Sequence, residues 1–222
     1  TYSLSKSGEA GKCTNYSNTA KIIQTSQSDS ETVTVCVGKD LTVSKTATAA
    51  LDRTYKWLID KSVDETKINI AESGTAIFNY SVKVTPDGYT DSGWTLGGTI
   101  TISNPNDWED VTVDVEDTLD QGGTCAITET APYVVPSSGS LTLHYTCTTS
   151  DGSTTKNTAT VTWDKAVYFT PTGSVSADAA VSFDLAKETN KVITVIDDKT
   201  DPDNPVTLGT SDYYAGPFEY TY

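Results

Sequence analysis

The sequence predicts an all-β protein folded as an antiparallel β-sandwich. Thr, Ser and Val are abundant in the composition, and the side chains of Thr, Val and Tyr fit a pleated strand better than a helix. Apolar and polar residues alternate with a period of two along most of the chain, as expected for half-buried strands. Clusters of Pro, Gly, Asn and Asp interrupt these segments at short intervals, which is typical of sandwiches. We expect very little helix.

The alternating segments define the expected strands. In chain order they are residues 32–37, 41–43, 55–59, 75–84, 99–102, 111–115, 141–145 and 158–163. The expected turns, rich in residues with special backbone angles or capping side chains, are residues 86–88, 104–107, 121–123, 136–139 and 150–152. Residues 181–187 have weak helical character, but their run Val-Ser-Phe-Asp-Leu alternates and therefore predicts a strand.

Charge and hydropathy exclude two classes of partner. The chain carries 15 basic and 30 acidic residues, a net charge of -15. Such a surface repels a phosphate backbone, so nucleic acid is not an expected partner. No apolar run approaches the roughly 20 residues needed to span a bilayer, so we expect no transmembrane segment. The chain starts at Thr1 with neither an initiator Met nor a signal-peptide pattern, which indicates a processed form or a segment of a longer protein.

The four cysteines, Cys13, Cys36, Cys125 and Cys147, predict two disulfides formed in an oxidising, extracellular environment. None belongs to a Cys-x-x-Cys pair and His144 is the single histidine, so a zinc site is poorly supported. Four cysteines allow three connectivities. We favour the sequence-local pairing, Cys13–Cys36 and Cys125–Cys147, because each pair brackets one plausible hairpin.

Five segments carry a resemblance to a known kind of domain. They read DLTVSKTATAALDRTYKWLIDKSVD at 40–64, GTITISNPNDWEDVTVDVED at 98–117, GGTCAI at 122–127, LTLHYTC at 141–147 and NTATVTWD at 157–164. Over residues 39–185 the chain resembles the Ig-like repeats of secreted bacterial and archaeal cell-surface proteins, which are typically strung in tandem. The resemblance implies an Ig-like β-sandwich and an extracellular structural role, and it implies no activity. It also implies that the NPNDW segment belongs to the scaffold.

The two ends of the chain resemble complementary halves of a second domain. Residues 18–22 echo residues 157–161, each run follows a cysteine, and an alternating strand comes after each. Residues 1–37 therefore resemble the closing half of an Ig-like repeat, and residues 188–222 resemble the opening half. We expect a complete Ig-like sandwich at residues 38–187 and a smaller Ig-like domain split between the termini.

The C-terminal strand continues in register into the N-terminal segment. Placed end to end, Phe218, Tyr220 and Tyr222, followed by Tyr2 and Leu4, lie on one face, and a slip of one residue would break this alternation. These residues are the expected subunit interface. Three arrangements are compatible with it: head-to-tail strand complementation between subunits, one period of a covalent tandem array, or closure within one chain as in a circular permutation. The first two produce a linear fibre, so we predict a self-associating subunit of an extracellular filament, pilus-like fibre or surface layer.

No constellation of residues predicts catalysis, and we expect neither an enzyme nor a cofactor. His144 lies in an alternating strand without a nucleophile motif, and we interpret it as a sheet-face residue. The acids that suggest glycosidase chemistry are Asp107, Glu109, Asp110, Glu116 and Asp117. We expect all of them to be solvated side chains in turns or at strand edges.

Some residues suggest binding or modification. Calcium is the candidate ligand of an oxygen-rich loop, although plain turns use the same residue types; its acids are Asp197, Asp198, Asp201 and Asp203. Asn15 and Asn79 begin Asn-x-Ser sequons and are candidate glycosylation sites; Asn15 has the more loop-like context.

The tryptophans raise an alternative function, a carbohydrate-binding or adhesive module that stacks sugars on aromatic rings. Trp94 and Trp108 lie near expected turns and are the better candidates. Trp57 and Trp163 lie inside alternating strands, where we expect core positions.

Ig-like surface domains sometimes contain a Lys–Asn isopeptide bond between a first and a last strand. The resemblance makes Lys45 and Asn157 the candidate pair, because they occupy roughly suitable places in the sequence. Such a bond also needs a buried acid, and the sequence does not identify one.

Overall fold

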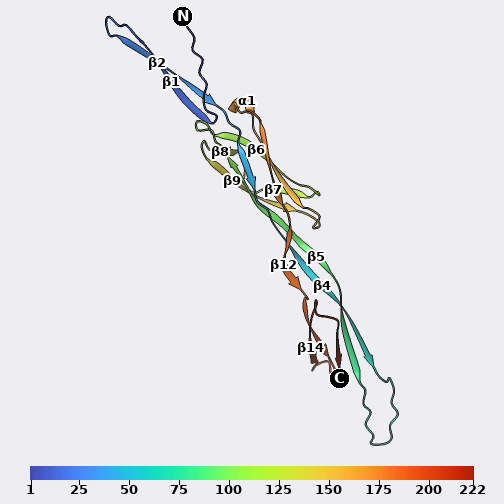
Figure 1. Cartoon of the computed structure of the whole chain (residues 1–222). Coiled ribbons are helices and arrows are strands. Elements are labelled where there is room, and N and C mark those ends of the chain that lie inside the picture. The colour runs from blue at the N-terminus through green and yellow to red at the C-terminus, as the bar shows by residue number, and fades with distance from the viewer. The chain divides into compact units, whose positions relative to one another are not determined.

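The computed structural model describes residues 1–222 and has an all-β, sandwich-type fold. Figure 1 shows its strands and its one short helix, α1 (Lys165–Tyr168). The strands are β1 (Lys12–Lys21), β2 (Ser28–Val37), β3 (Thr42–Lys45), β4 (Thr48–Val63), β5 (Tyr80–Ser103), β6 (Val111–Leu119), β7 (Thr124–Ile127), β8 (Tyr133–Val135), β9 (Ser140–Thr148), β10 (Lys156–Thr162), β11 (Ser174–Ala180), β12 (Phe183–Thr189), β13 (Val192–Asp197), β14 (Val206–Asp212) and β15 (Phe218–Thr221). The helix α1, with four residues, is too short to span a bilayer.

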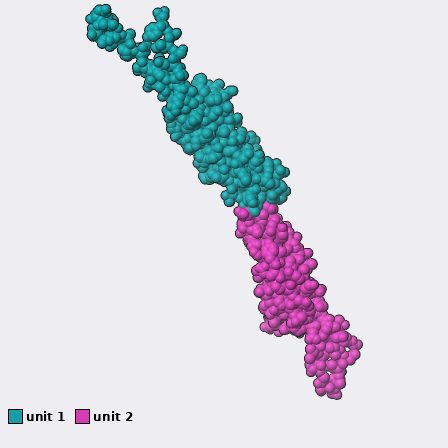
Figure 2. Space-filling model, in the orientation of Figure 1, with its two compact units in different colours: residues 1–49, 95–183 teal, residues 50–94, 184–222 magenta.

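The chain forms two compact units, coloured separately in Figure 2. Unit 1 comprises Thr1–Ala49 and Thr95–Phe183, and unit 2 comprises Ala50–Trp94 and Asp184–Tyr222. This division differs from the domains expected from the sequence, which were 38–187 and 188–222 joined with 1–37. The reason is the length of β4 and β5. At 16 and 24 residues they far exceed a usual strand of about 5–6 residues, and each contributes its two ends to different units.

Unit 1 contains a sandwich of two antiparallel layers. One layer has the strand order β11-β10-β6-β8, and the other consists of β3, the C-terminal part of β5, β9 and β7, in that order. Alternate residues of each strand point to the same face, so the inward-facing apolar side chains of both layers meet. The core that they form includes the buried residues Ile100, Ile102, Val111, Leu143 and Val161.

Buried amides hold the segment between β5 and β6. Asn104 donates a hydrogen bond to the Glu109 carbonyl, and Asn106 donates to the carbonyl of Lys39 and to Asn104 Oδ1. The Lys39 N–H donates in return to Asn106 Oδ1. These bonds satisfy polar groups that water cannot reach, so the NPNDW segment is scaffold in this structure.

β1 and β2 pair with each other as a two-stranded sheet within unit 1. One face of this hairpin is polar, and the hydroxyls of Ser17 and Thr32 form a hydrogen bond across the strands. The other face is more apolar and sets Tyr16 opposite Val33. Residues 1–9 form no strand, and part of this segment lies beside the apolar face.

Unit 2 has a smaller core. β12 pairs with β4, β4 with β5 and β15 with the N-terminal part of β5, while β13 and β14 form a separate two-stranded sheet. The main apolar cluster of the unit is centred on Val82, Val84 and Val195. Because Val195 comes from β13 and the other two valines from β5, this cluster joins the two sheets of the unit.

The residues expected at a subunit interface divide between the two units. Phe218, Tyr220 and Tyr222 pack against the valine cluster of unit 2, and β15 pairs with β5. Tyr2 and Leu4, in unit 1, are exposed. The C-terminal segment therefore forms its strand ladder inside unit 2, whereas Tyr2 and Leu4 belong to no strand.

Several local expectations need correction. The strand expected at residues 75–84 begins only at Tyr80, and residues 86–88, expected as a turn, lie within β5. Alternation predicts a strand, but a strand also needs a partner, and residues 75–79 are not part of any ladder. The strands β7 and β8, of four and three residues, were not among those expected from the sequence.

Candidate functional site

Three polar residues on three strands of unit 1 point into its core. Lys45 ends β3, Asp117 lies in β6 and Asn157 lies in β10. Each is in phase with the inward-facing apolar residues of its strand; the period that buries Val111 and Val113 also turns Asp117 inward. β3 belongs to one layer of the sandwich, whereas β6 and β10 belong to the other. The cluster therefore spans the two layers.

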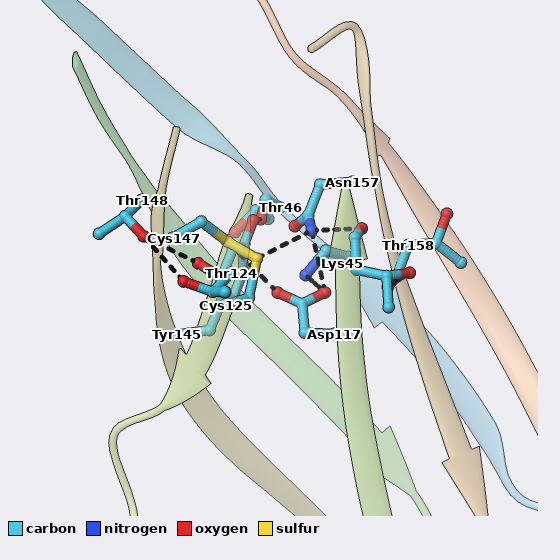
Figure 3. The surroundings of a disulfide bond; sticks show 11 residues. Lys45, Thr46, Asp117, Thr124, Cys125, Tyr145, Cys147, Thr148, Asn157 and Thr158 are labelled. Atoms are coloured by element: carbon cyan, nitrogen blue, oxygen red, sulfur yellow. Dashed lines mark hydrogen bonds and ion pairs between the residues drawn. A yellow bond between two sulfur atoms is a disulfide. The ribbon is translucent and has the colours of Figure 1, made fainter. Parts of the chain in front are cut away.

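Figure 3 shows the three side chains gathered around the Asp117 carboxylate. Lys45 Nζ lies 2.8 Å from Asp117 Oδ1, and Asn157 Nδ2 donates a hydrogen bond of 3.0 Å to the same oxygen. The side chains of Lys45 and Asp117 are 0% and 1% exposed, and Asn157 is fully buried. An amine, a carboxyl group and a carboxamide thus meet at one oxygen atom, out of contact with water.

Tyr145 and its neighbours hold the lysine in place. The Tyr145 ring lies against Lys45, with 3.3 Å from Nζ to the ring centroid. Its hydroxyl donates a 2.6 Å hydrogen bond to the carbonyl of Thr46, the residue after Lys45. Gly98 lies at this contact, and a β-carbon at position 98 would collide with the Thr46 carbonyl. The end of β3 is therefore fixed from two sides.

The hydrogen bonding of the cluster is incomplete. Asn157 Nδ2 donates to Asp117 Oδ1 and to the Thr118 carbonyl, but Asn157 Oδ1 is buried without a donor. Lys45 Nζ contacts Asp117 yet makes no hydrogen bond of good geometry. Leaving a buried polar group unsatisfied costs about 1–3 kcal/mol. Stability alone does not account for two such groups in an otherwise apolar core.

Burial shifts the protonation of the amine. Desolvation lowers the pKa of Lys45, and the neighbouring Asp117 carboxylate opposes this effect. Because burial disfavours the charged form, the amine of Lys45 loses its proton more readily than that of an exposed lysine. Burial also raises the pKa of Tyr145, so this ring stays neutral. A neutral lysine amine has a free electron pair and is a nucleophile.

The Cys125–Cys147 disulfide borders the cluster, as Figure 3 shows. It joins β7 to β9, and Cys125 Sγ lies 3.7 Å from Asn157 Nδ2. The Asp117 carboxylate and the two sulfurs converge closely enough to suggest metal ligands. Sulfurs joined in a disulfide carry no thiolate, which is the form that binds a metal. We therefore interpret this part of the site as a covalent staple.

The structure brings together the two residues suggested for an isopeptide bond and supplies the missing acid. Asp117 was expected to be solvated, and this expectation is wrong because its side chain is buried against Lys45. The neighbouring Glu116 is exposed, as expected, whereas Glu109 also departs from the expectation because it is half-buried and its Oε1 is inaccessible to solvent. The alternation along β6 could have predicted this burial, because Asp117 lies on the same face of the strand as Val111, Val113 and Val115.

Both disulfides have the sequence-local pairing. Cys13–Cys36 joins β1 to β2 and Cys125–Cys147 joins β7 to β9, with sequence separations of 23 and 22 residues. Disulfides of this kind are typical of chains that fold in an oxidising compartment.

In the acidic loop considered for calcium, the carboxylate of Asp197 is already paired with a lysine of unit 2. Asp197 accepts a 2.6 Å hydrogen bond from Lys61 Nζ and another from the Tyr222 hydroxyl, and these bonds lower the pKa of Asp197 to about 2. The other acids, which are exposed, are Asp198, Asp201 and Asp203. The four carboxylates do not converge on one point.

The tryptophans considered for sugar binding, Trp94 and Trp108, are both half-buried, which leaves less of each ring free for stacking. Trp163 is buried in the core of unit 1, and half-buried Trp57 packs against the valine cluster of unit 2. His144 is exposed on the outer face of β9, where its Nδ1 lies 2.7 Å from Glu129 Oε1, as expected for a sheet-face residue.

Both sequon asparagines are exposed. Asn15 lies in β1 and not in a loop, and its side chain accepts a hydrogen bond from the Thr34 hydroxyl. Asn79 immediately precedes β5, and its backbone N–H donates to Asp64. The structure therefore removes the preference for Asn15 that rested on a loop-like context.

The chain matches no protein-family model, no curated protein and no solved structure. Residue chemistry and architecture are thus the basis for assigning its function.

Proposed function

We propose that this chain is a structural subunit of an extracellular filament or surface layer. In this proposal the hairpin β1–β2 of one copy adds to unit 2 of the next copy, so that copies associate head to tail. The role agrees with the resemblance to Ig-like repeats of secreted surface proteins. Two disulfides and a net charge of -15 suit a protein displayed outside the cell.

The incompletely covered apolar face of the hairpin is the observation that carries the proposal. Val33 is 57% exposed and Ile23, at the hairpin tip, is 84% exposed. Tyr2 and Leu4 are also exposed, and together with Tyr16 and Val33 they line a groove of about 350 Å³. A two-stranded hairpin is marginally stable in water by itself, and gathered apolar side chains mark an interaction surface.

Unit 2 has the complementary deficit. In unit 1 a four-stranded layer covers the other layer of the sandwich, whereas in unit 2 the corresponding cover is the two-stranded sheet β13–β14. Addition of a hairpin would extend this cover to four strands, the number found in unit 1. Strand addition uses main-chain hydrogen bonds for affinity and alternate side chains for register.

The proposed contact uses two different surfaces and is therefore heterologous. A contact of this kind repeats without closing unless its rotation happens to form a ring, and so it generates linear assemblies. The register that continues from Tyr222 into Tyr2 and Leu4 supports the same order of segments. The occupant of unit 2 is then the N-terminal segment of a second copy.

Assembly is tested on the purified whole chain by negative-stain microscopy and light scattering over a range of protein concentrations. We expect filaments that grow with concentration and return to single subunits on boiling in detergent. The variant Val33→Glu places a charge on the apolar face of the hairpin and should abolish them. Removing residues 218–222 is a poorer test, because Phe218 and Tyr220 pack in the core of unit 2.

Thr32→Glu is the matched control, because Thr32 precedes Val33 on β2 and points to the polar face. It adds the same charge and should leave assembly intact. Monodisperse particles at every concentration, or equal assembly by both variants, would contradict the proposal. A ladder of sizes after boiling would show that copies are linked covalently and would contradict a separate-subunit filament.

A further inference from the structure

We propose that Lys45 Nζ and Asn157 Cγ become joined by an amide bond inside unit 1, with Asp117 transferring the protons. The reaction would be an intramolecular modification that the folded chain performs on itself. It goes beyond the proposed function and does not depend on assembly, because all three residues belong to one sandwich.

The geometry supplies a nucleophile next to its target. Asp117 Oδ1 contacts both Lys45 Nζ, at 2.8 Å, and Asn157 Nδ2, at 3.0 Å, so the amine and the carboxamide lie around one oxygen. Solvent does not reach these groups, because the side chains of Lys45 and Asp117 have essentially no exposed surface. Holding two reactants in a fixed geometry inside a water-free site raises their effective concentration and so increases the rate of the reaction between them.

Asp117 is placed to handle both proton transfers. The same Oδ1 that contacts the attacking nitrogen of Lys45 accepts a hydrogen bond from the leaving nitrogen of Asn157. A carboxylate in this position can take a proton from the ammonium and deliver one to the departing group, which is general acid–base catalysis. Both transfers run through short contacts that the fold already contains.

The reaction balances without an oxidant, a cofactor or an external nucleophile. The free electron pair of Lys45 Nζ forms a bond to Asn157 Cγ, the bond from Cγ to Nδ2 breaks, and the Asn157 nitrogen leaves as ammonia. Of the three ammonium protons of Lys45, one stays on the new amide nitrogen, one leaves with the ammonia and one remains on Asp117. The product has no buried charge, and the neutral Asp117 can donate to Asn157 Oδ1, which otherwise lacks a donor.

The bond would have a mechanical consequence. Lys45 ends β3 in one layer of the sandwich and Asn157 begins the inward series of β10 in the other. The neighbouring disulfide joins β7 to β9 within a single layer. A Lys45–Asn157 amide would therefore add a covalent link between layers, and tension on the chain could no longer separate β3 from β10.

Intact-mass spectrometry of the purified whole chain tests the bond directly. After allowance for the two disulfides, we expect a mass lower than that of the sequence by one ammonia. Proteolysis should then release a branched peptide in which the segment around Lys45 is joined to the segment around Asn157. A chain of full mass, or a mass deficit without this branched peptide, would overturn the proposal; a succinimide gives the second result.

Three variants test the assigned roles, and circular dichroism checks that each one folds. Lys45→Met and Asn157→Ala should restore the full mass by removing a reactant, and Asp117→Asn should restore it while keeping the shape of the side chain. Lys156→Met is the matched control, because Lys156 is adjacent to Asn157 but exposed, and it should retain the deficit. A cross-link that survives in Asp117→Asn would overturn the role given to the acid. Where a variant does not fold, the intact mass of the wild-type chain still tests whether the bond forms.

Discussion

Unit 1 contains two disulfide-linked strand pairs that differ in almost everything except the disulfide. Their cysteines are separated by 23 and 22 residues, and in both pairs the Cα atoms are 4.0 Å apart. β7 and β9 belong to a layer of the sandwich with a closed apolar core, whereas β1 and β2 form a separate two-stranded sheet whose apolar face is only partly covered, by residues 1–9. A disulfide fixes the register of two strands, but only packing against a second layer removes their apolar surface from water.

The same contrast explains where chemistry is possible. Beside Cys125–Cys147 the core excludes water, and it holds an amine, an acid and an amide at hydrogen-bonding distances. Beside Cys13–Cys36 the polar side chains are solvated, and pairs such as Thr19 with Ser30 only connect the strands. Reactivity between side chains of this kind needs both proximity and burial, and only the sandwich provides both.

Core truncation gives the largest expected difference between the two regions. Ile100→Ala removes a fully buried side chain and should lower the free energy of unfolding of the sandwich by about 2–5 kcal/mol. Val33→Ala on the hairpin should change it by less than about 0.5 kcal/mol. Hydrogen exchange of β9 and β10 amides measures both effects. Equal losses in the two variants would show that the hairpin is covered by a partner layer.

Removal of the disulfides gives the next largest effect. The two loops are of similar length, so loop entropy alone predicts the same loss, about 3 kcal/mol, for each. We expect this loss in the sandwich for the double variant Cys125→Ala with Cys147→Ala. The double variant Cys13→Ala with Cys36→Ala should instead accelerate hydrogen exchange in β1 and β2 and leave that of β9 and β10 unchanged. Coupled losses in both regions would contradict the independence of the hairpin.

Acid should weaken unit 2, whose small apolar cluster is supplemented by the contacts of Asp197 with Lys61 and Tyr222. The pKa of Asp197 falls from 3.8 to about 2, chiefly through the Lys61 hydrogen bond. A carboxyl group with a lowered folded-state pKa stabilises the fold above its unfolded-state pKa, and this contribution disappears as pH falls towards the folded-state value. Thermal unfolding should therefore occur at lower temperature between about pH 4 and pH 2. Asp197→Asn should flatten this dependence, and an unchanged profile would count against the contact.

Calcium gives the smallest expected effect. The Lys61 ammonium already pairs with the buried carboxylate of Asp197. The other acids of the loop do not lie close enough to Asp197 to share a metal ion with it. The melting temperature of unit 2 should be the same in calcium and in chelator, by differential scanning fluorimetry. A rise in calcium that Asp201→Asn removes would show that this loop acts as an ion-dependent staple, comparable to the two disulfides.

Much of the fold could be predicted from local patterns. Alternation identifies the strand character of β6, β9 and β10, and the cysteine positions favour the pairing that the structure has. Phase within β6 also contained the information that Asp117 points inward, because it continues the series of Val111 and Val113. This information was insufficient without knowledge of a facing group, since an acid in a strand is ordinarily solvated.

The sequence by itself determined the fold class, most strands and which side chains of each strand share a face, because a period of two is a local property of the extended backbone. Only the tertiary structure decided that Lys45, Asp117 and Asn157 meet, that β4 and β5 pass from one unit into the other, and that the apolar face of the hairpin stays partly exposed. These outcomes depend on which strands pair across long sequence separations, and many pairings are compatible with the same local alternation. The core of unit 1 selects one of them by burying its apolar faces together.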